Sequence, residues 1–182
     1  YPAIELLTAA LSLVLFWQYG LTWSLLLALL FTYALTAATF IDLKYQILPD
    51  EITLPMLWIG LLVNLNNMFT SITHAVIGAV VGYLVLWSIN FGYKLLSKKD
   101  GMGYGDFKLI AMVGAWCGYS YLIFIFLISS FLGLLVSILL ILFNGHQRKK
   151  PIAFGPYLAI AGFIALHWGY LIKAWFPFLI IG

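Results

Sequence analysis

Long apolar runs separated by short polar turns make up nearly the whole chain. Seven such runs lie at residues 4–18, 21–41, 52–65, 72–96, 107–116, 121–143 and 152–172. Each run is continuous, whereas the strands of a membrane β-barrel alternate apolar and polar residues over segments of about ten residues. The pattern therefore predicts seven helices. A helix needs about 20 apolar residues to cross a bilayer, so we expect the short runs at 52–65 and 107–116 to recruit flanking residues or to end at a water-filled cavity.

Composition places these helices in a membrane. Hydrophobic residues make up 64% of the 182 residues, charged residues make up 8%, and the mean hydropathy is +1.07. A soluble globule of this size does not carry so much apolar surface. We therefore predict an all-α fold, a polytopic integral membrane helical bundle of about seven transmembrane helices surrounded by membrane lipid. The chain shows no internal repeat or long linker, so residues 1–182 are expected to form a single domain.

The basic residues indicate an orientation. If the first helix starts in the cytoplasm, the cytoplasmic turns and helix ends hold eight basic residues, against Lys173 alone on the outer side. The eight are Lys44, Lys94, Lys98, Lys99, Lys108, Arg148, Lys149 and Lys150. This bias fits the positive-inside rule, and it puts Asp42 and Asp106 on the cytoplasmic face.

Some partners and cofactors are not expected. A net charge of +3, spread along the whole chain, argues against nucleic acid as a partner. Cys117 is the single cysteine, so the chain has no intrachain disulfide. The three histidines, His74, His146 and His167, show no metal-ligand spacing, and we expect no metal site.

Asp42 and Asp106 are the candidate catalytic residues. Asp42 follows the run at 21–41 and Asp106 precedes the run at 107–116, and a carboxylate at a membrane boundary is costly to desolvate. An aspartic hydrolase needs two neighbouring carboxyl groups, one ionised to take a proton from water and one protonated to polarise the scissile carbonyl. The shared proton belongs to the pair, so it is not assigned to either residue here. We predict that both are catalytic.

Residues next to these acids are candidates for supporting roles. Gly101, Gly103 and Gly105 would let the backbone adopt positive φ angles and form a mobile flap close to a substrate strand. Lys44 and Lys108 each lie two residues after one of the acids. They are either cytoplasmic anchors or ammonium groups that favour an ionised carboxylate.

Two further sites have alternative interpretations. Asp50 is a weaker rival for the first catalytic position, but its place just before the run at 52–65 favours a role as the N-cap of that helix. Gly155 and Pro156, near the start of the last run, indicate a local break or kink.

Several motifs carry a resemblance to a known family. They are FIDLK at 40–44, ILPD at 47–50, TLP at 53–55 and GYGDFK at 103–108, with YPAIELL at 1–7 and FGPYLA at 154–159. In this order they resemble the type IV prepilin peptidases, which are membrane aspartic proteases of the GxGD kind. The resemblance covers essentially the whole chain.

The resemblance implies an endopeptidase that cuts the basic leader from type IV prepilins and type II secretion pseudopilins at the cytoplasmic face of the bacterial inner membrane. Such substrates insert an apolar helix in the bilayer and keep the leader in the cytoplasm. Asp42 matches the first catalytic aspartate and Asp106 the second. Asp50 is a further candidate for holding the basic residues of such a leader, and the resemblance suggests that the segment at 155–156 lines the substrate groove. Proteolysis of this kind needs no cofactor.

Bifunctional members of the family carry an upstream membrane segment and a cytoplasmic region with CxxC pairs, and neither is present in these 182 residues. In those members the same chain also N-methylates the new terminus, so S-adenosylmethionine and zinc would be used only in a longer, bifunctional form. The main alternative function is a proton- or cation-coupled transporter that uses the two acids at the membrane boundary.

Overall fold

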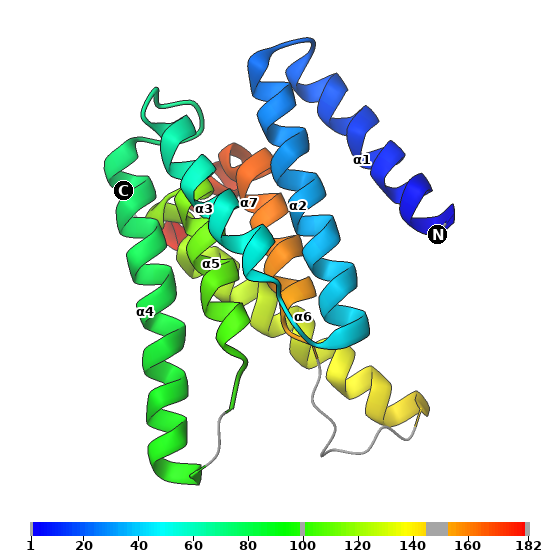
Figure 1. The fold of residues 1–182 in the computed structure, drawn as a ribbon, viewed down its shortest axis with the longest axis vertical. Coiled ribbons are helices and arrows are strands. Elements are labelled where there is room, and N and C mark those ends of the chain that lie inside the picture. The colour runs from blue at the N-terminus through cyan, green and yellow to red at the C-terminus, as the bar shows by residue number, and fades with distance from the viewer. Residues whose placement is uncertain (1, 99–100, 145–152, 181–182) are drawn as a thin grey trace.

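The chain is an all-α bundle (Figure 1). A computed structural model describes residues 2–98, 101–144 and 153–180. The described helices are α1 (Pro2–Tyr19), α2 (Trp23–Tyr45), α3 (Asp50–Asn64), α4 (Ile72–Ser97), α5 (Tyr104–Cys117), α6 (Leu122–Asn144) and α7 (Gly155–Trp175), with short 3-10 helices η1 (Tyr119–Tyr121) and η2 (Pro177–Leu179). These described ranges form no strand, and the prediction of a helical membrane bundle is confirmed.

Five of the described helices are long and apolar enough to cross a membrane: α1, α2, α4, α7, and α6 taken together with η1. The other two, α3 and α5, are the two short apolar runs, and both recruit polar residues at their N-terminal ends. Helix α3 starts at Asp50, and α5 takes in Tyr104, Gly105 and Asp106. The acidic motifs are therefore parts of helices rather than parts of loops.

Helix α5 lies at the centre of the bundle, against α3, α4 and α7. Every residue from Leu109 to Cys117 is buried. Where α4 crosses it, Gly78 faces Gly114, and a Cβ on either glycine would collide with the backbone of the other helix. Small residues at a crossing bring two membrane helices close together, which explains the close approach of α4 and α5 at this point.

The C-terminal end of α5 is held by hydrogen bonds as well as by packing. The indole of Trp116 donates to the Met56 carbonyl at 2.8 Å, and its ring lies 4.8 Å from that of Phe31, centroid to centroid. Asn64 is fully buried, and its amide nitrogen donates to the carbonyls of Ala115 and Trp116. Its amide oxygen accepts the N–H groups of Phe69 and Thr70. One side chain thus ties the α3–α4 turn to α5.

Helices α1 and α7 depart from simple packing. Helix α1 lies at the edge of the bundle, and Leu15 is its one buried residue among those described (Figure 1). Helix α7 begins at Gly155, with Pro156 in its first turn, so the sequence-based expectation of a kink at these two residues is wrong. The kink lies at Trp168, with φ −125° and ψ 18°.

The kink is accompanied by a polar cluster. The carbonyl of His167 accepts a hydrogen bond from the Gln18 side chain. The buried ring of His167 lies within hydrogen-bond distance of Tyr19 and Thr32, at 3.1 and 3.2 Å. Because an unsatisfied polar group inside a membrane is costly, this cluster stabilises the attachment of α1 and α2 to α7.

The ends of α2 and α4 and the starts of α3, α5 and α7 lie at one end of the bundle (Figure 1). Lys44, Lys94, Lys98 and Lys108 are therefore at that end, and Lys173 is near the other. Lys99, His146 and the basic residues at 148–150, which also entered the sequence-based assignments, lie outside the described residues.

Candidate active site

A cavity of about 200 Å³ lies where α2 ends and where α3 and α5 begin. Its lining is formed by Asp42, Gln46, Ile47, Leu48, Asp50, Gly103, Tyr104, Gly105, Asp106 and Lys108. Six residues predicted from the sequence are therefore in one place, although more than 60 residues of chain separate Asp42 from Asp106. Gly101 and Lys44, which were also predicted to support the site, do not line this cavity.

Asp42 is buried in the last turn of α2. One of its carboxylate oxygens accepts the backbone N–H of Gly155 at 3.0 Å, from the first residue of α7. A Cβ at position 155 would lie 2.6 Å from that oxygen, so only glycine allows this approach. The sequence analysis did not assign this role to Gly155. Its motif offered a signal, but the glycine next to a proline suggested a kink rather than a hydrogen-bond donor.

Asp106 is buried in the first turn of α5, ahead of the apolar run at 107–116. Burial raises the pKa of Asp106 to about 7, and the negative charge of nearby Asp42 contributes to the rise. A protonated Asp106 beside an Asp42 that accepts an N–H group matches the unequal pair that acid-base catalysis by two carboxyl groups requires.

Leu48 fills the space between the N-terminal ends of α5 and α7. A Cβ at position 105 would lie 2.7 Å from the Leu48 Cβ, and one at position 155 would lie 3.2 Å from its Cδ1. Leu48 is itself buried, in the loop between α2 and α3. The loop that follows Asp42 is thus seated against the helix that carries Asp106, because both neighbouring helices present glycine to it.

The glycines before Asp106 do not act as the sequence suggested. Among the described residues the positive-φ glycines are Gly20 and Gly118, whereas Gly103 has φ −71° and caps α5. Gly105 lies within α5, so it is not part of a flap. What Gly105 provides is room for Leu48, whereas a Cβ at position 103 would meet nothing closer than an Asp106 oxygen at 3.8 Å. The requirement for positive φ is therefore wrong.

Asn90 anchors the segment that precedes the cavity. Its amide oxygen accepts the N–H groups of Gly101 and Met102, at 2.9 and 3.1 Å. Asn90 is buried on α4, near the end of a long apolar run, and the sequence analysis did not select it. A lone asparagine inside such a run was the available signal, because a buried amide in a membrane helix needs hydrogen-bond partners.

Asp50 and Lys108 form an ion pair at the entrance of the cavity. The Lys108 ammonium lies 2.6 and 2.7 Å from the two oxygens of Asp50, and both side chains are partly exposed. The N-cap of α3 is Pro49, so the expected capping role of Asp50 is wrong. Lys44 is exposed, and its ammonium lies over the ring of Tyr45 at 4.9 Å from the ring centroid. Lys108, rather than Lys44, brings positive charge to this site.

Fold and site together describe a polytopic membrane protein in which two buried acids share a cavity at one end of the bundle. The chain belongs to the type IV leader peptidase family, whose family model matches residues 29–138. The matched region holds both acids and the ion pair, and it ends before Gly155. The resemblance found in the sequence is thereby confirmed.

Several curated relatives extend the comparison. The chain is 54% identical over 176 residues to a prepilin leader peptidase/N-methyltransferase of Aeromonas hydrophila, covering 97% of this chain and 61% of the relative. It is 48% identical over 169 residues to the protein of that name from Pseudomonas aeruginosa, covering 93% and 58%. For the protein of Legionella pneumophila the identity is 46% over 176 residues, covering 97% and 61%. The chain thus spans about three fifths of the length of these relatives. No solved structure matches it at a significant level.

Proposed function

We propose that this chain is the proteolytic part of a prepilin leader peptidase. It is an aspartic endopeptidase that removes the basic leader from type IV prepilins and type II secretion pseudopilins. The observation that carries the proposal is that Asp42 and Asp106 line one cavity at one end of the bundle. The names of the relatives support the choice of substrate.

The geometry supports different roles for the two acids. Burial disfavours the charged form of both acids, but the N–H group of Gly155 donates to Asp42 and partly offsets this, so Asp42 is the member of the pair proposed to be ionised and Asp106 the one that holds the proton. Asp42 takes a proton from water while the water oxygen attacks the scissile carbonyl carbon, and Asp106 gives its proton to the carbonyl oxygen. When the C–N bond breaks, Asp42 passes its proton to the leaving amine, and Asp106 recovers one from the tetrahedral intermediate. Both carboxyl groups return to their starting states.

The site faces the cytoplasm in this proposal. Lys44, Lys94, Lys98 and Lys108 lie at the same end as the two acids, and the positive-inside rule assigns that end to the cytoplasm of the bacterial inner membrane. A basic leader approaching there meets Asp50 at the mouth of the cavity. The position of both acids near one end, rather than near the membrane midplane, does not favour the transporter alternative.

The names of the relatives also include N-methyltransferase activity. We assign methylation, together with S-adenosylmethionine and zinc, to a longer form of the protein. The described residues do not fit a zinc ion, because they contain no group of three or more His, Cys, Asp or Glu side chains that could hold a metal. Cys117, in particular, is buried against the Gly162 carbonyl. The proteolytic steps above are carried out by the two carboxyl groups.

The test is leader removal by purified protein in lipid. The wild type is incubated with a prepilin that keeps its leader, and the products are identified by mass spectrometry. We expect cleavage between leader and mature chain, near-complete loss in Asp42→Asn and in Asp106→Asn, and a loss of less than about tenfold in Asp50→Asn. Robust cleavage by folded Asp106→Asn protein would sink the mechanism.

A further inference from the structure

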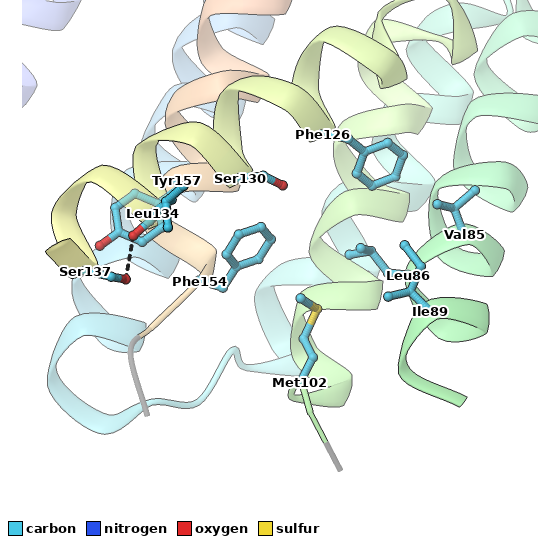
Figure 2. A pocket seen from close by; sticks show the side chains of 11 residues that line it. Val85, Leu86, Ile89, Met102, Phe126, Ser130, Leu134, Ser137, Phe154 and Tyr157 are labelled. Carbon is cyan, nitrogen blue, oxygen red and sulfur yellow. Dashed lines mark hydrogen bonds between the residues drawn. The ribbon is translucent and has the colours of Figure 1, made fainter. Parts of the chain in front are cut away.

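Figure 2 shows the residues that line a second cavity, of about 520 Å³. It is bounded by α4, by α6, by the segment before α5 and by the start of α7. Its walls are mostly apolar, with Ile89 on α4, Phe126 and Leu134 on α6, and Phe154 before α7. Ser130 points into the space from α6 (Figure 2). The candidate mechanism uses none of these residues.

The cavity is joined to the active site by chain neighbours. Met102 lines the second cavity, and the next residue, Gly103, lines the first. Phe154 also lines the second cavity, and the next residue, Gly155, donates to Asp42. Met102 and Phe154 therefore form a wall with the apolar cavity on one side and the two acids on the other.

The surroundings suit a helix. Helices α4 and α6 diverge toward the end that carries the acids (Figure 1), and residues of both helices line the cavity. On α6, Ser130, Gly133 and Ser137 line the opening, and small residues let another membrane helix approach closely. The hydroxyl of Ser137 donates to the Gly133 carbonyl at 2.6 Å, so it presents no free donor to an apolar partner.

We infer that this groove receives the apolar helix of the prepilin, the helix that follows the scissile bond and is inserted in the bilayer. The inference rests on the proposed function and names the place where the enzyme holds its substrate. A helix that lies between α4 and α6 brings the residues before it to the wall formed by Met102 and Phe154. There the extended segment crosses into the first cavity, and the scissile carbonyl reaches Asp42 and Asp106.

There are two alternatives to this assignment: a lipid chain fills the groove between α4 and α6, or the prepilin helix binds in a second groove. The experiments below distinguish them. An apolar cavity of about 260 Å³, lined by Leu11, Thr36 and Phe163 among others, lies between α1, α2 and α7. It is smaller, and no residue of the segment before α5 lines it. For these reasons we assign the apolar helix of the prepilin to the groove between α4 and α6.

The first experiment is photo-crosslinking in membranes, with a crosslinking phenylalanine derivative at one position of the complete Asp106→Asn protein and a co-expressed prepilin. We expect crosslinks to the prepilin from positions 89 and 134, and at most one tenth as much from position 139, which is exposed and, two and a half turns after Ser130, lies on the opposite face of α6. Crosslinks from position 11 in place of 89 and 134 would overturn the inference in favour of the second groove. Equal crosslinking at 139 and 134 would overturn it in favour of a lipid-filled opening.

The second experiment compares two substrates, the complete prepilin and a short water-soluble peptide that spans the scissile bond. Ser130→Trp fills the groove, and we expect the ratio of prepilin cleavage to peptide cleavage to fall at least tenfold. The matched control is Leu139→Trp, which is exposed on the face of α6 opposite Ser130, and for which the ratio should stay at the wild-type value. An unchanged ratio in folded Ser130→Trp protein would overturn the groove. If the wild type cleaves neither substrate, the proposed function itself fails, and the inference fails with it.

Discussion

At its C-terminal end α5 is enclosed by large side chains and a buried amide, whereas at its N-terminal end it borders a cavity with two acids. Trp116, with no exposed surface, and Asn64 close the first end. The second end has glycine at positions 103 and 105 and a buried carboxyl group at 106. Helix α5 is thus densely packed at its C-terminal end and borders a cavity at its N-terminal end. The packed end fixes the position of the helix, and the cavity leaves space beside the two acids.

A buried asparagine organises the chain at each end. Asn64 accepts the N–H groups of two successive residues and also donates to two carbonyls of α5, so it fastens the turn and the helix together. Asn90 likewise accepts two successive N–H groups, from Gly101 and Met102, but these lie in the segment that leads to the cavity with the two acids. The comparison suggests that Asn64 contributes mainly to stability and Asn90 mainly to the placement of Met102 and Asp106.

The largest expected effect concerns the acids themselves. Asp42→Asn and Asp106→Asn should each reduce leader cleavage by about 10⁴-fold or more, because either change removes half of a unit that works as a pair. The double variant should lose no more than the worse single variant. Thermal unfolding of all three in detergent should stay at or above the wild-type midpoint, since a buried carboxyl group that lacks a full counter-charge is a cost to folding. Additive losses in the double variant would mean that the acids act independently.

The asparagines offer a matched pair of substitutions. Asn64→Ala leaves two N–H groups and two carbonyls without this partner, so we expect a loss of about 2–4 kcal/mol in the free energy of unfolding. Asn90→Ala should cost less stability but lower the cleavage rate about tenfold, because the segment before α5 loses its attachment. Unfolding in denaturant and initial cleavage rates measure the two effects. If both variants lose stability and activity in the same proportion, the two ends of α5 do not differ in the way we describe.

Most of the helices could be predicted from the sequence, because a membrane helix corresponds to one continuous apolar run. The two acids could also be identified as candidates, since each lies at the end of such a run. The contacts that position them could not be predicted. The hydrogen bond from Gly155 to Asp42 links residues 113 positions apart, and it depends on how α2 and α7 rotate about their axes. The place of Leu48 between Gly105 and Gly155 depends on three segments at once, which no local pattern encodes.

A smaller effect separates the two glycines beside Asp106. Gly105→Ala adds a methyl group that would lie 2.7 Å from the Leu48 Cβ, so the loop after Asp42 must shift, and we expect cleavage to fall about tenfold. Gly103→Ala adds one in ordinary contact, and its activity should stay within about threefold of wild type. Initial rates on a prepilin, compared at equal amounts of folded protein, decide between them. Equal losses of cleavage rate in the two variants would indicate that both glycines act through backbone flexibility.

The smallest expected effect is a shift in the pH profile. The pKa of Asp106 is raised to about 7, so Asp106 keeps its proton below that pH and loses it above. Since the mechanism needs this proton, kcat/KM should fall as the pH rises through about 7. In Lys108→Met the nearby ammonium is absent, which favours the protonated acid, and the fall should move to higher pH. The move should be less than about one pH unit, because Asp50 already neutralises Lys108 and water screens both.

The control is Lys44→Met, which removes an ammonium that lies over Tyr45 and outside the cavity, and its profile should match the wild type. An equal shift in both variants would show that the general surface charge, rather than the ion pair at the cavity mouth, sets the profile.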